Sequence, residues 1–132
     1  MAQKAKATQK KAKKIKIQVP VGRLYVLSTF NNTKLTITDL DGNVLCWSNC
    51  GTIGFKGSKK STAFAATKAA EDLVVKAQRY GLQEVHAFIR GIGQGRTAAI
   101  KGARAAGLKI NFITDKTPIP HGGVKPKKQR KV

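Results

Sequence analysis

The sequence predicts an α/β fold: one domain with a mixed five-stranded sheet, the element order β-β-β-α-β-α-β, and helices packed on the sheet. Apolar residues alternate with a period of two in five short segments, as strands require, and recur at helical spacing in two others. Each helical segment stands between two strand segments, and such crossovers favour parallel pairing and a right-handed connection. The length of 132 residues suits a single domain.

The first three strands are predicted to form an antiparallel meander. Apolar side chains occupy both faces of the first of them, as a central strand requires. The turn between the second and third is marked by Asp41-Gly42, a strong hairpin signal. The predicted strands are residues 23–29, 35–40 and 44–49, and Asn31-Asn32 supplies the first turn.

A helix followed by a strand is then predicted twice. Ser61 or Thr62 can cap the first helix, whose alanines suggest close packing against the sheet, and Gly81 can end it. Thr97 can cap the second helix, which Gly107 ends. The predicted helical residues are 65–80 and 98–106, and the fourth and fifth strands are 85–89 and 108–113.

Positive charge is the dominant feature of the composition. The chain has 26 Lys and Arg against 6 Asp and Glu, a net charge of +20. So many positive charges repel one another in a compact domain, so the imbalance indicates an anionic partner. Nucleic acid is the first candidate and an anionic membrane surface is the second. No apolar run approaches the roughly 18 residues of a membrane span, and the N-terminus lacks the apolar stretch of a secretory signal.

Like charges gather at both ends of the chain. Residues 1–16 contain seven lysines and residues 121–132 contain five basic residues, without an acid in either block. Such blocks stay unfolded on their own, so they either order on nucleic acid or only aid solubility. We therefore predict a disordered basic N-terminal tail at 1–16, a core domain at 17–116 and an extended basic C-terminal tail at 117–132.

A phosphate site is predicted in the loop 54–62, which joins the third strand to the first helix. Its glycines allow a close approach of backbone to ligand, and its lysines and hydroxyls stand just before a helix N-terminus, whose N–H groups and dipole favour an anion. An ordinary solvated loop is the alternative. The candidate RNA-binding residues are Lys56, Gly57, Ser58, Lys59, Lys60 and Ser61.

A second glycine loop lies between the fourth strand and the second helix. Its spacing is G-x-G-x-G and not the G-x-G-x-x-G of dinucleotide sites, although Asp115 lies about 20 residues further on, where a ribose-binding acid would stand. The flanking arginines favour phosphate contact over a dinucleotide, and a tight turn without ligand is the remaining alternative. The candidate residues are Arg90, Gly91, Gly93, Gly95 and Arg96.

The C-terminal tail is the third candidate RNA-binding segment. Prolines keep residues 117–126 extended and glycines let them bend, so the segment can thread into RNA and end in a basic anchor. The candidate residues are His121, Lys125, Lys127, Lys128, Arg130 and Lys131.

Catalytic and metal chemistry fit the remaining residues poorly. Metal-dependent hydrolysis needs clustered carboxylates, whereas Glu71 and Asp72 are predicted on the helix face away from its apolar stripe. His86 and His121 have no evident nucleophile beside them and are predicted to be satisfied surface histidines. We predict no enzyme activity, no cofactor and no metal.

Two further residue classes narrow the function. Cys46 and Cys50, spaced C-x3-C, lack the additional ligands of a zinc site, so a structural place in a strand is favoured over a metal or redox role. Aromatic residues are sparse at 6%, so base stacking is not expected to be the dominant mode of binding.

Four segments together resemble the bacterial type of the small-subunit ribosomal protein eleven family. The resemblance covers about residues 20–132 in the right order and leaves the N-terminal lysines unmatched. The segments are Phe30-Asn31-Asn32-Thr33, the stretch from Gly51 through Gly54-Phe55-Lys56-Gly57 and Lys60-Ser61-Thr62 to Phe64-Ala65-Ala66, Gly91-x-Gly93-x-Gly95-Arg96, and Thr117-Pro118-Ile119-Pro120-His121.

The resemblance implies a ribonuclease-H-like topology without enzyme activity and a seat on the platform of the small subunit. There the family binds 16S-type rRNA near the mRNA exit and the cleft for the Shine–Dalgarno region, beside ribosomal proteins that include protein seven. It implies a ribosome of the bacterial cytoplasm or of an organelle with bacterial-type ribosomes, and no membrane or homo-oligomer. The residues implied to face RNA are Lys56, Ser58, Lys59, Lys60, Arg96, His121 and the C-terminal lysines.

The sequence departs from the family pattern at several positions. The family commonly has Pro at Ile92, an acid at Thr97, Asn at Gly122 and Cys at Val124. The usual arginine-rich ending is lysine-rich here, and only Arg grips a phosphate with a bidentate fork.

We therefore expect a structural protein of the small ribosomal subunit that supports translation by holding rRNA. A general nucleic-acid condenser would instead bind any RNA or DNA of equal length equally well. A metal nuclease on a ribonuclease-H-like sheet would depend on Asp39 or Asp115.

Overall fold

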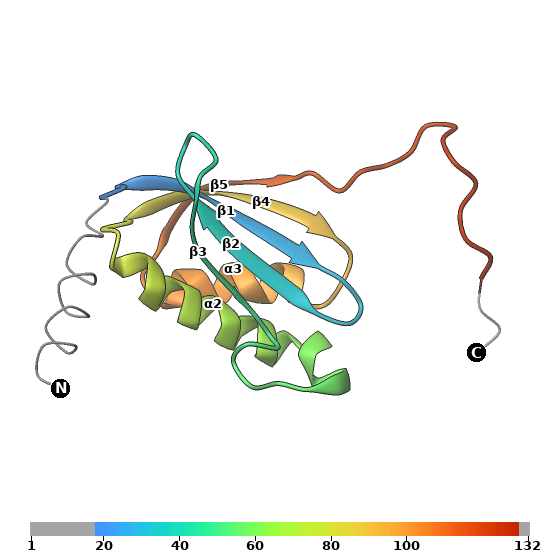
Figure 1. Ribbon diagram of the computed structural model, residues 1–132, viewed down its shortest axis with the longest axis horizontal. Helices are drawn as coiled ribbons and strands as arrows, with labels where there is room; N and C mark the ends of the chain where they lie inside the picture. Colours follow the sequence, from blue (N-terminus) through green and yellow to red (C-terminus); the bar gives the residue numbers. More distant parts are fainter. Residues whose placement is uncertain (1–17, 130–132) are drawn as a thin grey trace, which may run out of the picture.

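The structure, a computed structural model, has two layers: a five-stranded sheet and two α-helices that lie on one of its faces (Figure 1). It describes residues 18–129. The predicted N-terminal tail and the candidates Arg130 and Lys131 lie outside the described residues.

The sheet is mixed, as predicted, with the strand order β3-β2-β1-β4-β5. The meander β1-β2-β3 is antiparallel, and the two helical crossovers bring β4 parallel to β1 and β5 parallel to β4. This arrangement agrees with the expected ribonuclease-H-like topology. The strands are β1 (Val21–Ser28), β2 (Thr33–Thr38), β3 (Val44–Asn49), β4 (Glu84–Gly91) and β5 (Lys109–Asp115).

The helices begin for different physical reasons. The Thr62 hydroxyl accepts a hydrogen bond from the Ala65 N–H at 3.2 Å, which confirms Thr62 as a cap. The prediction of a Thr97 cap is wrong: the second helix begins earlier, at Gly95, which packs closely on Thr33, so Thr97 lies inside the first turn and no side chain caps the helix. The helical elements are η1 (Gly57–Ser61), α2 (Ala63–Gln78) and α3 (Gly95–Ala105).

The core lies between the sheet and the helices. Leu24 and Val26 of β1 are buried in one core cluster with the alanines of α2. Gly102 lets α3 approach α2 closely, since an added Cβ would stand 3.2 Å from the Ala70 Cβ. Asp72 was predicted to face away from the core, but its carboxylate accepts a hydrogen bond from the Ser48 hydroxyl at 3.0 Å. The Asp72 side chain therefore links α2 to β3.

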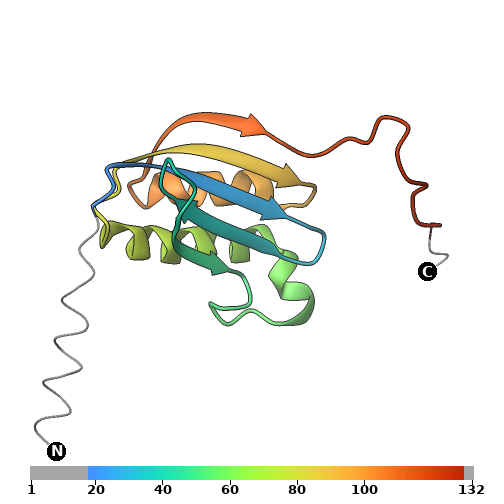
Figure 2. The ribbon, with the colours of Figure 1, turned by 45° about the horizontal axis from the view of Figure 1, so that its top comes forward.

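The other face of the sheet carries no helix among residues 18–129 (Figure 2). β1 is central in the strand order, as predicted, yet only its Leu24 and Val26 face is buried. Tyr25 is half-buried and Leu27 is 38% exposed on the opposite face. We call this uncovered surface the open face.

Both cysteines are free thiols and both are buried. Burial raises the pKa of the Cys46 thiol to about 11 and also raises that of Cys50. Because the thiolate is the reactive form, we expect neither thiol to react with Ellman's reagent at about pH 8 in the folded protein, and both to react in denaturant. Reaction of the folded protein at the rate of an unfolded thiol would contradict this prediction.

Candidate nucleic-acid interface

The fold brings the predicted RNA-binding segments to one end of the molecule. The helices α2 and α3 begin side by side, since a Cβ added to Gly95 would stand 3.1 Å from the Ala66 Cβ. The η1 turn precedes α2, the 91–94 loop precedes α3, and the C-terminal tail leaves β5 at the same end (Figure 1). We call the surface formed by η1, the 90–96 segment and the first tail residues the basic end.

The η1 turn presents its lysines to solvent. Lys56 and Lys59 are exposed and Lys60 is half-buried, and none of the three forms a salt bridge within residues 18–129. The Ser61 hydroxyl donates to the Ser58 carbonyl at 2.8 Å, so it stabilises the turn. The first turn of α2 contains no acid, which leaves the positive end of its dipole uncompensated. This surface therefore attracts anions.

The glycines of the second loop serve packing against β1. Gly91 has φ +93°, and a Cβ there would stand 2.2 Å from the Ser28 carbonyl oxygen. A Cβ on Gly93 would stand 2.5 Å from the Thr29 carbonyl oxygen. The Gly91 N–H donates to the Thr117 hydroxyl at 3.1 Å. The tight-turn alternative thus accounts for Gly91 and Gly93 without a ligand.

The two arginines of this loop lie in different surroundings. Arg90 is exposed and has no salt bridge among the described residues. The Arg96 Nη2 donates to the Asp115 carboxylate at 2.6 Å, and this pair links α3 to the end of β5. Arg90 is therefore the arginine available to a phosphate, whereas the charge of Arg96 is already compensated.

Asp115 is held by three hydrogen bonds. Its carboxylate accepts from the Thr117 hydroxyl at 2.6 Å, the Thr117 N–H at 2.9 Å and Arg96. These bonds, the Thr117 hydroxyl first, lower the pKa of Asp115 to about 2. Since the pKa of the folded state is depressed below the usual 3.8, the stabilisation is complete above that value and is lost as the pH falls through about 2.

We expect Thr117→Val and Arg96→Gln each to raise the pKa of Asp115, because the first removes the hydroxyl bond and the second removes a bond and a neighbouring positive charge. The measurement is an NMR titration of the Asp115 side-chain carboxyl carbon. Equal pKa values in both variants and the unmodified protein would contradict the role of these contacts.

The C-terminal tail runs away from the body beyond Thr117 (Figure 1). The Lys116 N–H donates to the Ile89 carbonyl at 2.8 Å, which is the last sheet-like bond within residues 18–129. His121, Lys125, Lys127 and Lys128 are exposed and have no regular secondary structure. These candidates therefore do not belong to the same rigid surface as the η1 lysines.

The acids do not form a catalytic centre. Asp39 follows β2, where its carboxylate accepts from the Asn43 N–H at 2.9 Å, while Asp115 lies toward the opposite end of the sheet, paired with Ile89. Within residues 18–129 there is no group of three metal-ligating side chains. A two-carboxylate nuclease site therefore has no geometric basis here.

His86 differs from its prediction as a satisfied surface histidine. Its ring stacks on Phe112 with the centroids 4.2 Å apart, and its Nδ1 is buried without a hydrogen-bond partner. The prediction failed because Phe112, on the neighbouring strand, covers the imidazole.

Comparison with known proteins identifies the family. Residues 22–131 match the model of the family described as ribosomal protein S11. The chain belongs to the ribosomal protein S11 family. It is also similar to the small ribosomal subunit protein uS11 of Nautilia profundicola, with 51% identity over 129 residues that cover 97% of this chain and 99% of that protein.

Family membership confirms the resemblance found in the sequence motifs. This is a family of ribosomal structural proteins of the small subunit and not a class of enzymes. The bacterial source of the relative agrees with the expected type of ribosome. No helix within residues 18–129 has the length and apolar character needed to cross a membrane.

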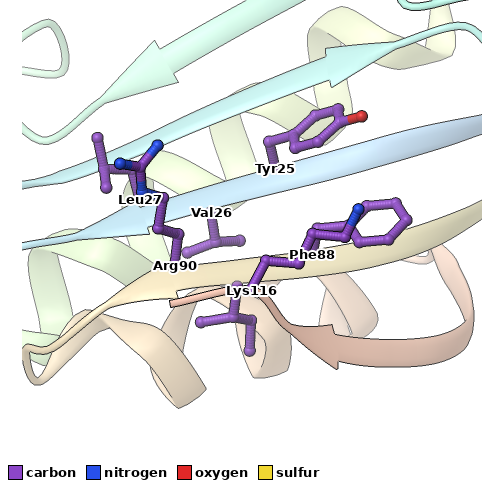
Figure 3. A pocket seen from close by; sticks show the side chains of 7 residues that line it. Tyr25, Val26, Leu27, Phe88, Arg90 and Lys116 are labelled. Carbon is purple, nitrogen blue, oxygen red and sulfur yellow. The ribbon is translucent and has the colours of Figure 1, made fainter. Parts of the chain in front are cut away.

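Sequence reasoning missed the open face as a possible site. Tyr25 and Phe88 stack there with ring centroids 5.4 Å apart, and the Lys116 ammonium lies 4.4 Å from the Phe88 centroid (Figure 3). The sequence did contain a signal for this surface: a basic and an aromatic residue alternate along each of two strands, Arg23 with Tyr25 and Phe88 with Arg90.

Proposed function

We propose that this ribosomal protein of the S11 family holds 16S-type rRNA at the platform of the small subunit, with the basic end against the RNA. The observation that supports this most directly is the cluster of Lys56, Lys59 and Lys60, which forms no salt bridge within residues 18–129 and stands just before the start of α2. Phosphates are the groups on RNA that such a cluster attracts.

The tails complete the proposed mechanism by neutralising further phosphates. Lys125, Lys127 and Lys128 sit on an extended segment that can follow a groove between RNA helices, and Arg130 and Lys131 continue the same basic run. A place near the mRNA exit and beside protein seven follows from the family resemblance and belongs to this proposal.

The two arginines provide a test within one loop. Arg90→Gln should weaken rRNA binding and reduce the slope of log K against log salt by about 1, because it removes one phosphate contact. Arg96→Gln should leave that slope unchanged, since Arg96 already pairs with Asp115. Salt titrations of both variants measure this, and a larger slope change for Arg96→Gln would reverse the assignment.

The experiment that tests the function compares a folded platform fragment of small-subunit rRNA with a scrambled RNA of equal length. Salt is titrated from about 50 to 200 mM, a range over which 6 to 10 phosphate contacts cost roughly 10³ to 10⁵ in affinity. A preference for the platform fragment that persists at the higher salt is the expected result. Equal affinities for the two RNAs that fall together as salt rises would overturn a specific binding site on the platform. They would favour a general nucleic-acid condenser, which the net charge of +20 alone would support.

A further inference from the structure

A groove crosses the open face and continues to the end of the central strands. It consists of two adjoining hollows that share Leu27 and Arg90. The first is lined also by Tyr25, Phe88 and Lys116 (Figure 3). The second is lined also by Phe30, Ile92 and Pro118. We call the two hollows together the sheet groove.

The floor of the sheet groove is apolar and partly aromatic. Tyr25 and Phe88 lie on adjacent strands in register, with ring planes inclined by 22°. Phe30 is 73% exposed and Ile92 is 56% exposed at the far end of the groove. Surface of this kind, gathered in one place, indicates a contact with another molecule.

The rim of the sheet groove is cationic. Arg90 and Lys116 line the groove, and the strand register places Arg23 and Lys34 on the same face. None of the four forms a salt bridge within residues 18–129. Glu84 is the one carboxylate that the five strands place on this face, and Lys109 and Asn111 already hold it at the opposite end of β4. The groove thus offers uncompensated positive charge beside flat apolar surface.

The positive charge of the sheet groove distinguishes among the molecules that could occupy it. The N-terminal segment of this chain, with its seven lysines, and a second copy with net charge +20 would both be repelled. Single-stranded RNA carries a phosphate for each cation and a flat base for each ring, so it complements both features of the groove. A regular RNA duplex complements only the cations, because its bases are stacked inside the helix.

We infer that the sheet groove binds two or three unpaired nucleotides of RNA, with bases against Tyr25 and Phe88 and phosphates against Arg90 and Lys116. The choice of RNA as the ligand rests on the proposed function, but the sheet groove is a different surface from that of the η1 lysines. The Lys116 ammonium already lies over Phe88, and an incoming base takes its place there while the ammonium turns to the adjacent phosphate. The sparse aromatics are thus concentrated, since Tyr25, Trp47, Phe88 and Phe112 all lie on the open face.

The first test uses the full chain and a single-stranded RNA of about six nucleotides at about 200 mM salt, which suppresses the contribution of the tails. Because stacking is worth about 1–3 kcal/mol per base, the double variant Tyr25→Leu with Phe88→Leu should bind this RNA at least about fivefold more weakly. The matched control Phe112→Leu removes an exposed ring of the same face outside the groove and should change the affinity less than about twofold. Binding by the double variant within twofold of the unmodified protein would overturn the inference.

A second measurement needs no variant. Ultraviolet crosslinking of the unmodified protein to the same RNA, followed by trypsin digestion, should place adducts on the peptides 24–34 and 80–90, which contain Tyr25 and Phe88. Adducts confined to the η1 turn and the tail would overturn the inference and leave the open face to a protein neighbour. Failure of the proposed function is distinguishable, because it shows as a lost preference for the platform fragment in the unmodified protein.

Discussion

Gly91→Ala is expected to lower the free energy of unfolding by about 2–4 kcal/mol. The residue has φ +93°, where a Cβ is strained, and the added Cβ would stand 2.2 Å from the Ser28 carbonyl oxygen. That oxygen belongs to the backbone of the central strand and cannot move aside without displacing β1. Urea unfolding measures the loss as a lower midpoint with an unchanged slope.

Gly107→Ala is the matched control for this prediction. Gly107 has a similar φ of +107°, but no atom lies within 4 Å of its added Cβ. Backbone strain alone should then cost about 1–2 kcal/mol. If both variants lose the same stability, close packing on Ser28 is not what requires Gly91, and the approach of a ligand becomes the better explanation of the loop.

The glycine loop shows why its function could not be settled from sequence. A backbone that approaches a phosphate and a backbone that approaches another strand both require residues without a Cβ. The G-x-G-x-G spacing is therefore the same for either use. Only the distances from Gly91 to Ser28 and from Gly93 to Thr29 distinguish them.

The fold was predictable because its elements have strong local signals. Alternation located five strands, alanine spacing located α2, and the crossovers predicted the parallel pairing of β4 with β1 and of β5 with β4. The boundaries were less predictable: β5 continues to Asp115 by pairing with β4, beyond the apolar residues that mark its start. Thr97 failed as a cap because α3 already begins at Gly95, so Thr97 lies inside its first turn.

The candidate site was predictable in composition but not in its pairings. Lysines before a helix indicate an anion site from local sequence alone. The bond between Arg96 and Asp115 and the stack of Tyr25 on Phe88 join residues far apart in the chain, so they follow only from the sheet register. Those pairings reduce the expected role of Arg96 and reveal the sheet groove.

The triple variant Lys56→Ala, Lys59→Ala, Lys60→Ala is expected to have the largest effect on RNA binding. Each lysine that contacts a phosphate releases a counterion, so the slope of log K against log salt should fall by about 2–3 for the platform fragment. The corresponding loss of affinity at about 100 mM salt is roughly 10- to 100-fold. Salt titrations of the variant and the unmodified protein provide both quantities.

A control variant separates local contact from total charge. Arg79→Ala, Lys101→Ala and Arg104→Ala remove the same number of charges from exposed positions at the end of α2 and on α3, away from the basic end, and none of the three forms a salt bridge within residues 18–129. Because exposed charges beyond a Debye length are largely screened, this variant should retain most of the slope and affinity. Equal losses in the two triple variants would mean that the RNA responds to net charge alone. In that case the η1 lysines would be ordinary members of a basic surface, and specificity would have to come from the sheet groove or the tails.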